Sequence, residues 1–499
     1  MRIWLFKSFA VLALLLAAVP ARAHVGSPNV FYDGTAGPYS VRVVVRPPLV
    51  IPGLAEITVK LGEAKAGEVT VQPILWKAGP KGAPPPDVAV PVPGAPGVWS
   101  AQLWLMVGSS YGVLVHVQGP AGSGEVLVPV AALPTQVLGM KKGMGAVLAA
   151  LGLFLFAGAV TLVVSSVRES TLPPGEVPDE RRRRKARIAG IVSAVLFALA
   201  LWQGRVWWNN VNAEARGDLY KPFHIRTSVS LEAGKPVLAL AIADERSVDW
   251  SPLMPDHGKL MHLFLLREPG LDAFAHLHPV RQDKDDFKVP LPPLPAGRYR
   301  VYADVVHESG FPQTLVDTVT IPEGGSGPQA AALVSDPDDS WRAAEPLASQ
   351  TTPGPKIAKL EGGGTMRWSQ EPLVANRETT LRFEVRDPEG RPLPLEPYMG
   401  MLSHAMITRD DGKVFVHLHP MGTINMAAQE SFEKKVGMER MPGMDHASMP
   451  GMSHGPSVLS FPYEFPQPGR YRLWVQVKSG GQVRTGVFDA QVGKPGRNQ

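Results

Sequence analysis

The sequence contains no cysteine. This absence excludes disulfide bonds, zinc sites built from cysteine, iron–sulfur clusters and thiol catalysis. The HExxH, Walker and dinucleotide-binding motifs are also missing, so none of these signatures predicts an enzyme. A metal site in this chain would have to use histidine, methionine, carboxylates or a terminal amine.

Glycine and proline are frequent, with 50 of each among 499 residues. Proline is therefore about twice as common as usual. These residues separate short runs rich in β-branched side chains, which indicates strands and turns rather than helices. We predict a mainly β protein with three periplasmic immunoglobulin-like β-sandwich domains and two transmembrane helices.

Residues 1–23 have the pattern of a secretory signal peptide. Arg2 and Lys7 flank the start of an apolar run, and Ala21-Arg-Ala23 is a cleavage site of the small-x-small type. Cleavage would make His24 the mature N-terminus, and an uncleaved anchor is the alternative.

Two apolar segments, 144–167 and 188–208, predict transmembrane helices. The segment between them, 168–187, carries a run of arginines and is predicted to be a cytoplasmic basic loop, because positive loops stay inside. Both large flanking regions would then be periplasmic, which agrees with the signal peptide. We therefore expect a multi-pass protein of the inner membrane, in contact with the lipid bilayer and not with nucleic acid.

The remaining sequence divides into β-sandwiches at 24–138, 209–325 and 355–495, with a linker at 326–354. The second and third are predicted to be internal repeats. Each contains a histidine, then His-Leu-His-Pro, then Gly-Arg-Tyr-Arg. The third copy has an insertion rich in methionine and histidine, 421–456, which we therefore place in a surface loop.

In the third sandwich, Asp410-Asp-Gly-Lys413 predicts a tight hairpin turn. The resulting register places His404 opposite His419 and Met406 opposite His417. All four side chains would share one face of the hairpin and could bind one metal ion.

In the second sandwich, a turn around Gly270 gives the same arrangement. His262 would lie opposite His278, and Phe264 opposite His276. This predicts a second patch of three histidines. Further candidates near it are Met254, His257, Met261, Asp304 and His307.

The insertion contains a tandem repeat of Met-Pro-Gly-Met followed by a polar residue and histidine. Its candidate ligands are Met441, Met444, His446, Met449, Met452 and His454. Thioethers prefer Cu(I), and imidazole binds copper in either oxidation state, so the cofactor predicted is copper. A low-complexity loop without a ligand is the alternative.

The mature N-terminus offers one more candidate site. The amine and ring of His24 can chelate Cu(II), and His116 is the other histidine of that domain. A packed role for His116 is the alternative.

The N-terminal domain resembles the YtkA-like and FixH-like periplasmic sandwich domains. The resemblance rests on Gly37-Pro-Tyr-Ser-Val-Arg-Val43, Pro47-Pro48 and Trp99-Ser-Ala-Gln-Leu-Trp-Leu-Met106. An exported sandwich that begins with histidine is also similar to the periplasmic copper-resistance protein C family, which implies a copper ligand at His24. The Met/His insertion looks like those of periplasmic copper carriers and oxidases, but the His-Cys-His of multicopper oxidases is absent.

Together these features predict an inner-membrane protein that binds copper in the periplasm, for resistance, delivery or sensing. Its partner would be a periplasmic copper protein or a membrane complex. We do not expect an enzyme. The alternatives are a scaffold or assembly factor that binds no metal and, less favoured, a copper-dependent oxidoreductase.

Overall fold

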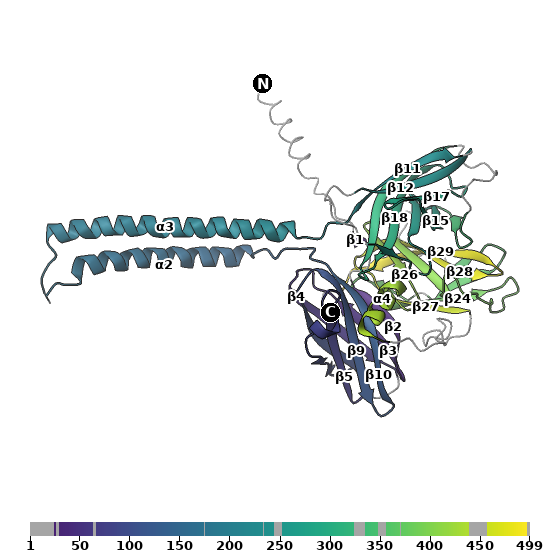
Figure 1. Cartoon of the computed structure of the whole chain (residues 1–499), viewed down its shortest axis with the longest axis horizontal. Coiled ribbons are helices and arrows are strands. Elements are labelled where there is room, and N and C mark those ends of the chain that lie inside the picture. The colour runs from purple at the N-terminus through teal and green to yellow at the C-terminus, as the bar shows by residue number, and fades with distance from the viewer. Residues whose placement is uncertain are drawn as a thin grey trace, which may run out of the picture. The chain divides into compact units, whose positions relative to one another are not determined.

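The computed structural model describes residues 24–25, 29–62, 66–173, 175–232, 234–243, 252–323, 335–347, 356–369, 371–438 and 457–496. The chain divides into two compact units, Met1–Ala132 with Pro222–Gln499, and Leu133–Lys221. The first unit is built mainly of antiparallel sheets, and the second contains two long helices (Figure 1). The protein is therefore mainly β, as predicted. The signal peptide predicted at 1–23 lies outside the described residues.

The N-terminal sandwich consists of two sheets, with strand orders β2-β3-β4-β8-β7 and β10-β9-β5-β6. The elements are β2 (Val30–Ala36), β3 (Tyr39–Arg46), β4 (Gly53–Leu61), β5 (Glu68–Leu75), η1 (Pro80–Gly82), β6 (Asp87–Val88), β7 (Val90–Pro91), β8 (Val98–Leu105), β9 (Ser109–Gly119) and β10 (Gly122–Ala132). Along β4, Ala55, Ile57 and Val59 are buried while Leu54 and Glu56 are exposed. This period-two pattern directs one face of the sheet to the core, which both sheets line.

The middle sandwich contains the first His-Leu-His-Pro copy. Its sheets have the orders β11-β12-β17-β16 and β13-β18-β14-β15-β20, with β19 beside β18. The strands are β11 (His224–Glu232), β12 (Lys235–Ala243), β13 (Leu253–Met254), β14 (His262–Arg267), β15 (Ala273–Leu277), β16 (Val280–Arg281), β17 (Asp286–Pro290), β18 (Gly297–His307), β19 (Pro312–Ile321) and β20 (Ser340–Ala343). The predicted linker, 326–354, thus supplies an edge strand, because β20 pairs with β15.

The C-terminal sandwich contains the second copy. Its sheets have the orders β1-β26-β25-β28-β29-β23 and β21-β22-β24-β27. The elements are β1 (His24–Val25), β21 (Ile357–Lys359), β22 (Thr365–Ser369), β23 (Leu373–Val374), β24 (Glu378–Arg386), β25 (Ser403–Arg409), β26 (Val414–Leu418), α4 (Met426–Val436), β27 (Val458–Glu464), β28 (Gly469–Ser479) and β29 (Gln482–Gly493). The strand of His24 thus pairs with β26 of this sandwich rather than with the N-terminal one.

The insertion is only partly described, and its first part is not a surface loop. Helix α4 buries Met426, Ala428 and Phe432. The ring of Phe432 packs edge-on against Trp76 of the N-terminal sandwich at 5.1 Å between centroids. Sequence spacing against the other repeat could not reveal this, because the surface that α4 covers belongs to a different domain.

The middle and C-terminal sandwiches pack face to face through an aromatic cluster. It combines Phe264, Phe274 and Tyr302 with Phe415 and Trp474. The rings of Tyr302 and Phe415 stack at 3.9 Å between centroids and 6° between planes, and those of Phe274 and Trp474 at 4.9 Å and 16°. Across the same interface the Tyr302 hydroxyl donates to the carbonyl of Gly412. The two repeats therefore form one packed body rather than two independent modules.

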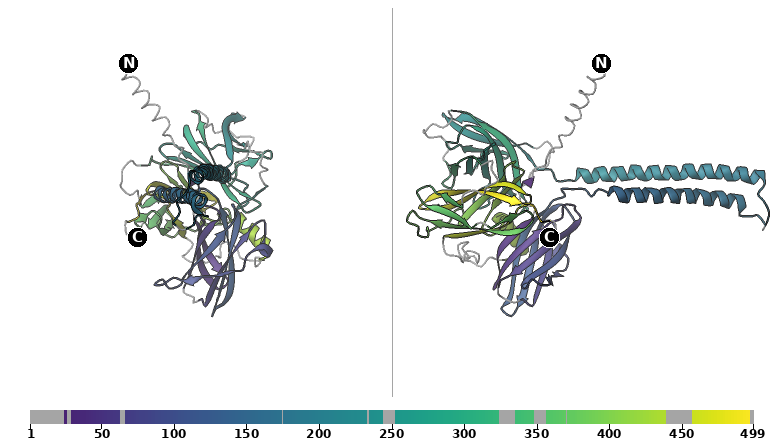
Figure 2. Two further views of the ribbon diagram at one scale, coloured as in Figure 1. Left: turned by 90° about the vertical axis from the view of Figure 1, so that its left-hand side faces the viewer. Right: turned by 180° about the vertical axis from the view of Figure 1, so that it is seen from behind.

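The second unit is an antiparallel pair of helices, α2 (Lys142–Glu169) and α3 (Glu180–Gly217), seen from two further directions in Figure 2. Both are long and apolar enough to cross a membrane, by length and composition. The predicted basic loop, 168–187, is helical from Glu180, because Asp179 caps the helix through the amide of Arg182 and arginine is a good helix former. At the small residue Gly190 the helix approaches Val164 of α2.

Candidate metal centre

Two β-hairpins with the same register carry the histidines. In the C-terminal sandwich β25 and β26 pair Met406 with His417. In the middle sandwich β14 and β15 pair Phe264 with His276. Both registers are the predicted ones. Because side chains two apart on a strand share a face, His404 and His262 lie on the same faces as these pairs.

Each hairpin gathers its three histidines into a buried group. We call His262, His276 and His278 the first triad and His404, His417 and His419 the second triad. Within each triad one ring nitrogen per residue lies within 4.8 Å of the others. All six residues are at most 8% exposed. Either triad can hold a metal ion.

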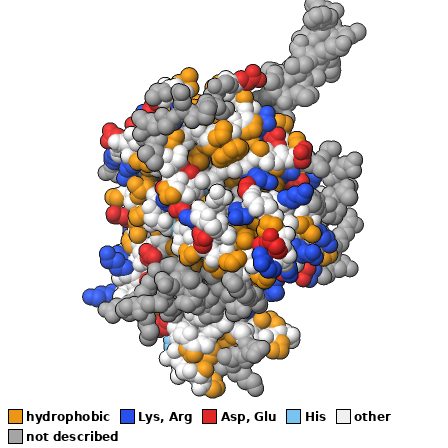
Figure 3. Space-filling view, turned by 90° about the vertical axis from the view of Figure 1, so that its right-hand side faces the viewer, with side chains coloured by type: hydrophobic (Ala, Val, Ile, Leu, Met, Phe, Trp, Pro, Cys, Tyr) orange, Lys and Arg blue, Asp and Glu red, His pale blue; other side chains and the backbone are white. Residues whose placement is uncertain are grey.

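The two triads are not separate patches, as the sequence suggested, but one cluster. The rings of His262 and His417 are 5.5 Å apart, those of His276 and His417 5.7 Å, and those of His276 and His404 6.3 Å. The cause is the aromatic interface, because each hairpin buries the face that carries its triad against the other sandwich. Little histidine surface is visible on the face of the molecule in Figure 3.

Backbone carbonyls fix the ring of the first histidine of each triad. His262 donates from Nε2 to the carbonyl of Asp256, and His404 from Nε2 to the carbonyl of Tyr398, both at 3.1 Å. A carbonyl only accepts, so in the neutral ring the proton sits on Nε2 and the Nδ1 lone pair faces inward. There Nδ1 of His262 lies 3.2 Å from Nε2 of His276, and Nδ1 of His404 lies 3.1 Å from Nε2 of His417.

These nitrogen–nitrogen distances suit a shared metal ion. Metal–nitrogen bonds of about 2.0 Å at a tetrahedral angle place two ligand nitrogens about 3.3 Å apart. The outer nitrogens of the second histidines are also held. His276 Nδ1 lies 2.9 Å from Oε1 of Gln476, and His417 Nδ1 lies 3.5 Å from Oδ2 of Asp304. Each outer partner belongs to the opposite sandwich.

The third histidine of each triad completes the pattern. His278 Nδ1 is 3.0 Å from Oδ1 of Asp339, and His419 Nδ1 is 3.0 Å from the carbonyl of Ile424. Among the described residues, neither Nε2 atom has a hydrogen-bond partner. Outer hydrogen bonds to carbonyls and carboxylates are what orients metal-binding histidines. Six ring nitrogens therefore face inward, where an ion could bind, and those of His262 and His276 and of His404 and His417 lie within hydrogen-bond distance of each other.

Burial lowers the pKa of five of the six triad histidines. Desolvation, followed by the charges of neighbouring histidines, lowers the pKa of His262 to about 3. Desolvation and the proximity of His257 lower that of His419 to about 4. The pKa values of His276, His404 and His417 also fall well below the ordinary value of 6.5. Neutral imidazole is the form that binds a metal, so the triads are ready to coordinate at neutral pH.

Two carboxylates adjoin the cluster. Burial raises the pKa of Asp304 to about 7, against a hydrogen bond from Thr314 that lowers it. Asp339 lies beside His278, and together with Asp336 these form a further group whose ligand atoms are close enough for an ion. The bond of Asp339 to the outer nitrogen of His278 fits a role in orienting that ring.

The other predicted residues are distributed as follows. Met406 lies in the aromatic cluster beside Phe264 and Phe415. Met261 is in the core of the middle sandwich, and His307 bonds to Gln313 through Nε2 at 3.2 Å.

The insertion ligands Met441, Met444, His446, Met449, Met452 and His454 lie outside the described residues, as does the side chain of His24. His116 is on β9 of the N-terminal sandwich, whereas the strand of His24 joins the C-terminal one.

His257 was only a possible addition from the sequence, and the structure makes it the seventh histidine of the cluster. Its ring lies 4.9 Å from that of His419 and 5.4 Å from that of His404, both in the other sandwich. The available signal was a residue pair, His257-Gly258 and Met399-Gly400, five residues before the first triad histidine in both copies.

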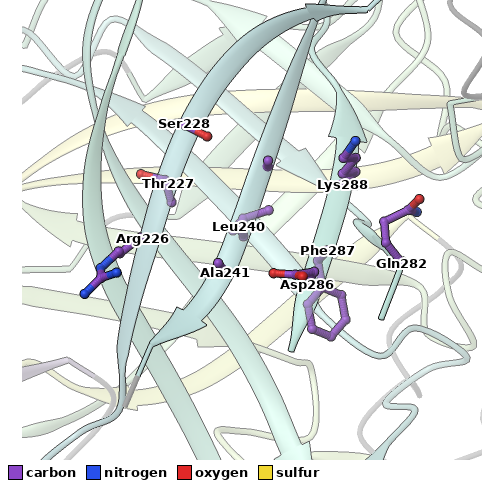
Figure 4. Close-up of a pocket in the computed structure, with 10 residues that line it drawn as sticks. Arg226, Thr227, Ser228, Leu240, Ala241, Gln282, Asp286, Phe287 and Lys288 are labelled. Atoms are coloured by element: carbon purple, nitrogen blue, oxygen red, sulfur yellow. The ribbon is translucent and has the colours of Figure 1, made fainter. Parts of the chain in front are cut away.

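A depression of about 330 Å³ lies elsewhere, on the sheet that contains β11, β12 and β17. Figure 4 shows Arg226 on β11, Leu240 on the neighbouring strand and Lys288 on the next. None of its lining residues is a histidine of the cluster, so it is a different feature.

One family model matches part of the chain. The model of a domain of unknown function, DUF8832, matches residues 222–323 and 358–494, the middle and C-terminal sandwiches. No curated protein matches the chain.

Solved structures share only weak likeness with the chain. The Escherichia coli adhesin FdeC is 11% identical, with 92% of this chain and 99% of that one covered and a TM-score of 0.15. A 1.5-MDa bacterial ice-binding adhesin is 8% identical, with 89% and 92% covered and a TM-score of 0.14. The extending region of a large adhesion protein is 9% identical, with 89% and 71% covered and a TM-score of 0.15. Scores of this size carry no argument about function.

Proposed function

We propose that this chain is an inner-membrane protein that binds copper in the periplasm through its buried histidine cluster, for copper resistance, delivery or sensing. One observation carries the proposal. Five of the six triad histidines have one ring nitrogen hydrogen-bonded to an outer partner, that of His417 lies 3.5 Å from Asp304, and all six present the other nitrogen to their neighbours. Outer partners of this kind orient the rings of metal-binding histidines, which is what supports an ion at the inward-facing nitrogens.

The ligand chemistry favours copper over other metals. Imidazole binds copper, zinc, nickel and iron, and copper is the tightest of the divalent first-row ions. The chain has no thiolate for structural zinc, and 17 methionines include the repeated Met-Pro-Gly-Met of the insertion. Thioethers select Cu(I), so an insertion of this composition would collect copper near the cluster.

The helical unit supports a membrane location. Large apolar side chains on α2 and α3, among them Leu153, Phe154, Leu162 and Leu196, are exposed. Many exposed apolar side chains on one pair of helices are typical of helices that are surrounded by lipid. With the basic end of α3 in the cytoplasm, all three sandwiches would be periplasmic, where a copper protein or a membrane complex would be the partner.

We propose binding rather than catalysis as the role of the centre. The cluster is buried, and the depression of Figure 4 does not include it. A scaffold that binds no metal is the competing function, and the two differ in a direct measurement.

The test is copper binding by the full-length protein in detergent, with a competing chelator. His404→Ala is expected to weaken binding by at least about tenfold, since loss of an outer partner alone costs roughly that much at metal sites. The matched control is His224→Ala, because His224 is exposed on β11 outside the cluster. The proposal is refuted if the wild-type protein binds no copper, or if His404→Ala and His224→Ala bind copper with equal affinity.

A further inference from the structure

Two equivalent turns precede the two triads. The turns Asp256–Lys259 and Tyr398–Met401 each close with a pair of backbone bonds between their end residues. Their second residues have left-handed backbones, with φ of 51° at His257 and 50° at Met399, and a glycine follows each. The carbonyl of the first residue accepts the bond from the first triad histidine in both. His257 and Met399 therefore occupy the same place in the two repeats.

Each turn reaches over the triad of the other sandwich. The ring of His257, in the middle sandwich, is 4.9 Å from that of His419 in the C-terminal one. In the reverse direction, the hydroxyl of Tyr398 lies 3.3 Å from Nδ1 of His276. The two contacts are related by the same pairing of repeats, and we extend this relation to Met399, which would then face the first triad as His257 faces the second.

Both residues are buried. The side chain of His257 is 4% exposed, and its Nε2 has no hydrogen-bond partner among the described residues. Met399 is 7% exposed, yet it belongs to none of the apolar clusters that the described residues form. A buried thioether is a suitable ligand for a soft metal ion such as Cu(I).

We infer that the cluster holds two metal ions, each bound by the triad of one sandwich and closed by a fourth ligand from the other. His257 would close the second triad, and Met399 the first. This inference rests on the proposed function. Six converging nitrogens exceed what one four-coordinate ion accepts, whereas two sets of three plus one match it.

The two ions would differ in character. Four imidazoles bind the ion at the second triad, whereas the ion at the first triad has three imidazoles and a thioether. Because thioethers favour Cu(I), the first ion is expected to hold Cu(I) more tightly relative to Cu(II) than the second. The asymmetry comes from a single exchange of histidine for methionine between two otherwise equivalent turns.

The test uses the crossing of ligands between sandwiches. Cu(I) affinity is measured anaerobically on the full chain with a competing chelator. In a His404→Ala background, where the second ion is lost, Met399→Leu is expected to weaken the surviving ion by about tenfold or more. In a His262→Ala background, where the first ion is lost, Met399→Leu is expected to have no effect on the remaining ion. His257→Ala is expected to weaken binding of that ion. Met106→Leu, at an exposed methionine of the N-terminal sandwich, is the matched control.

Further readouts separate ligation from folding. Met399→His keeps a ligand, so it should restore binding and shift the preference from Cu(I) toward Cu(II). We expect His262→Ala and His404→Ala each to lose one ion per chain. The variant that combines them should lose two. Loss of only one ion when both triads are changed together, or equal effects of Met399→Leu and Met106→Leu, would overturn the two-ion arrangement while leaving copper binding intact. Absence of copper from the cluster would instead refute the proposed function.

Discussion

The interface between the repeats should control metal binding, and Phe415→Ala tests this. Phe415 is 1% exposed, and its ring contacts Tyr302 at 3.9 Å and Phe264 at 5.3 Å, both in the opposite sandwich. Replacing a buried phenylalanine by alanine costs about 3–5 kcal/mol. Because the partners of this ring lie across the interface, the loss should fall mainly on docking of the two sandwiches rather than on their folding.

A loss of about 3–5 kcal/mol lowers the docking equilibrium constant by roughly two to four orders of magnitude. A ligand that needs the docked state then binds more weakly in proportion to the fraction that remains docked. Copper should in turn restore docking, because it binds the docked state preferentially. We therefore expect apo Phe415→Ala to unfold in two transitions, which copper brings back toward one.

The matched control is Phe461→Ala, at a fully buried phenylalanine in the core of the C-terminal sandwich alone. It should destabilise that sandwich by a similar amount but leave copper affinity unchanged below its unfolding transition. Calorimetry and chelator competition provide both readouts. If Phe415→Ala binds copper as tightly as Phe461→Ala does, the interface does not assemble the centre and the reasoning fails.

Three further predictions concern topology, the insertion and pH. A reporter active only in the cytoplasm should be silent when fused after Gln499 and active when inserted at Gly175, between α2 and α3; activity at Gln499 would overturn the membrane model. Deleting 439–456 should reduce the copper bound per chain and leave the thermal transition in place, because α4 ends before this segment and β27 begins after it; collapse of the transition would contradict this. The apo protein should lose stability as pH falls from about 6.5 toward 4, since the folded-state pKa values of His262 and His419 are depressed to about 3 and about 4, and the unfolded chain binds protons that the folded chain does not; a urea midpoint that stays constant over this range would refute the assignment.

The sequence was sufficient for the hairpins because their signals are local. The period of two along a strand and the Asp-Gly turn together determine which residues oppose each other, and Met406 does pair with His417. The same reasoning gave the pairing of Phe264 with His276. Neither result needed knowledge of any residue outside the hairpin.

Contacts between domains could not be predicted in the same way. The outer partner of His276 is Gln476, 200 residues away along the chain, and that of His417 is Asp304. Nothing in the pattern around the hairpins indicates that Phe264 and Phe415 bury each other. The two triads therefore form one cluster because sheet faces far apart in the sequence pack together. No short sequence motif predicts this packing.

The proposed fourth ligands, His257 and Met399, could be predicted only in part from the sequence. Asp256 and Tyr398 are different residues, so a search for identical side chains misses their equivalence, although both accept the bond from the first triad histidine through the backbone carbonyl. What the repeats share is the backbone, a left-handed residue followed by glycine, five positions before the first histidine. The side chain at the left-handed position is then free to vary between His257 and Met399 without changing the turn. A duplicated fold can in this way keep two metal sites in the same place while giving each a different affinity for the two oxidation states of copper.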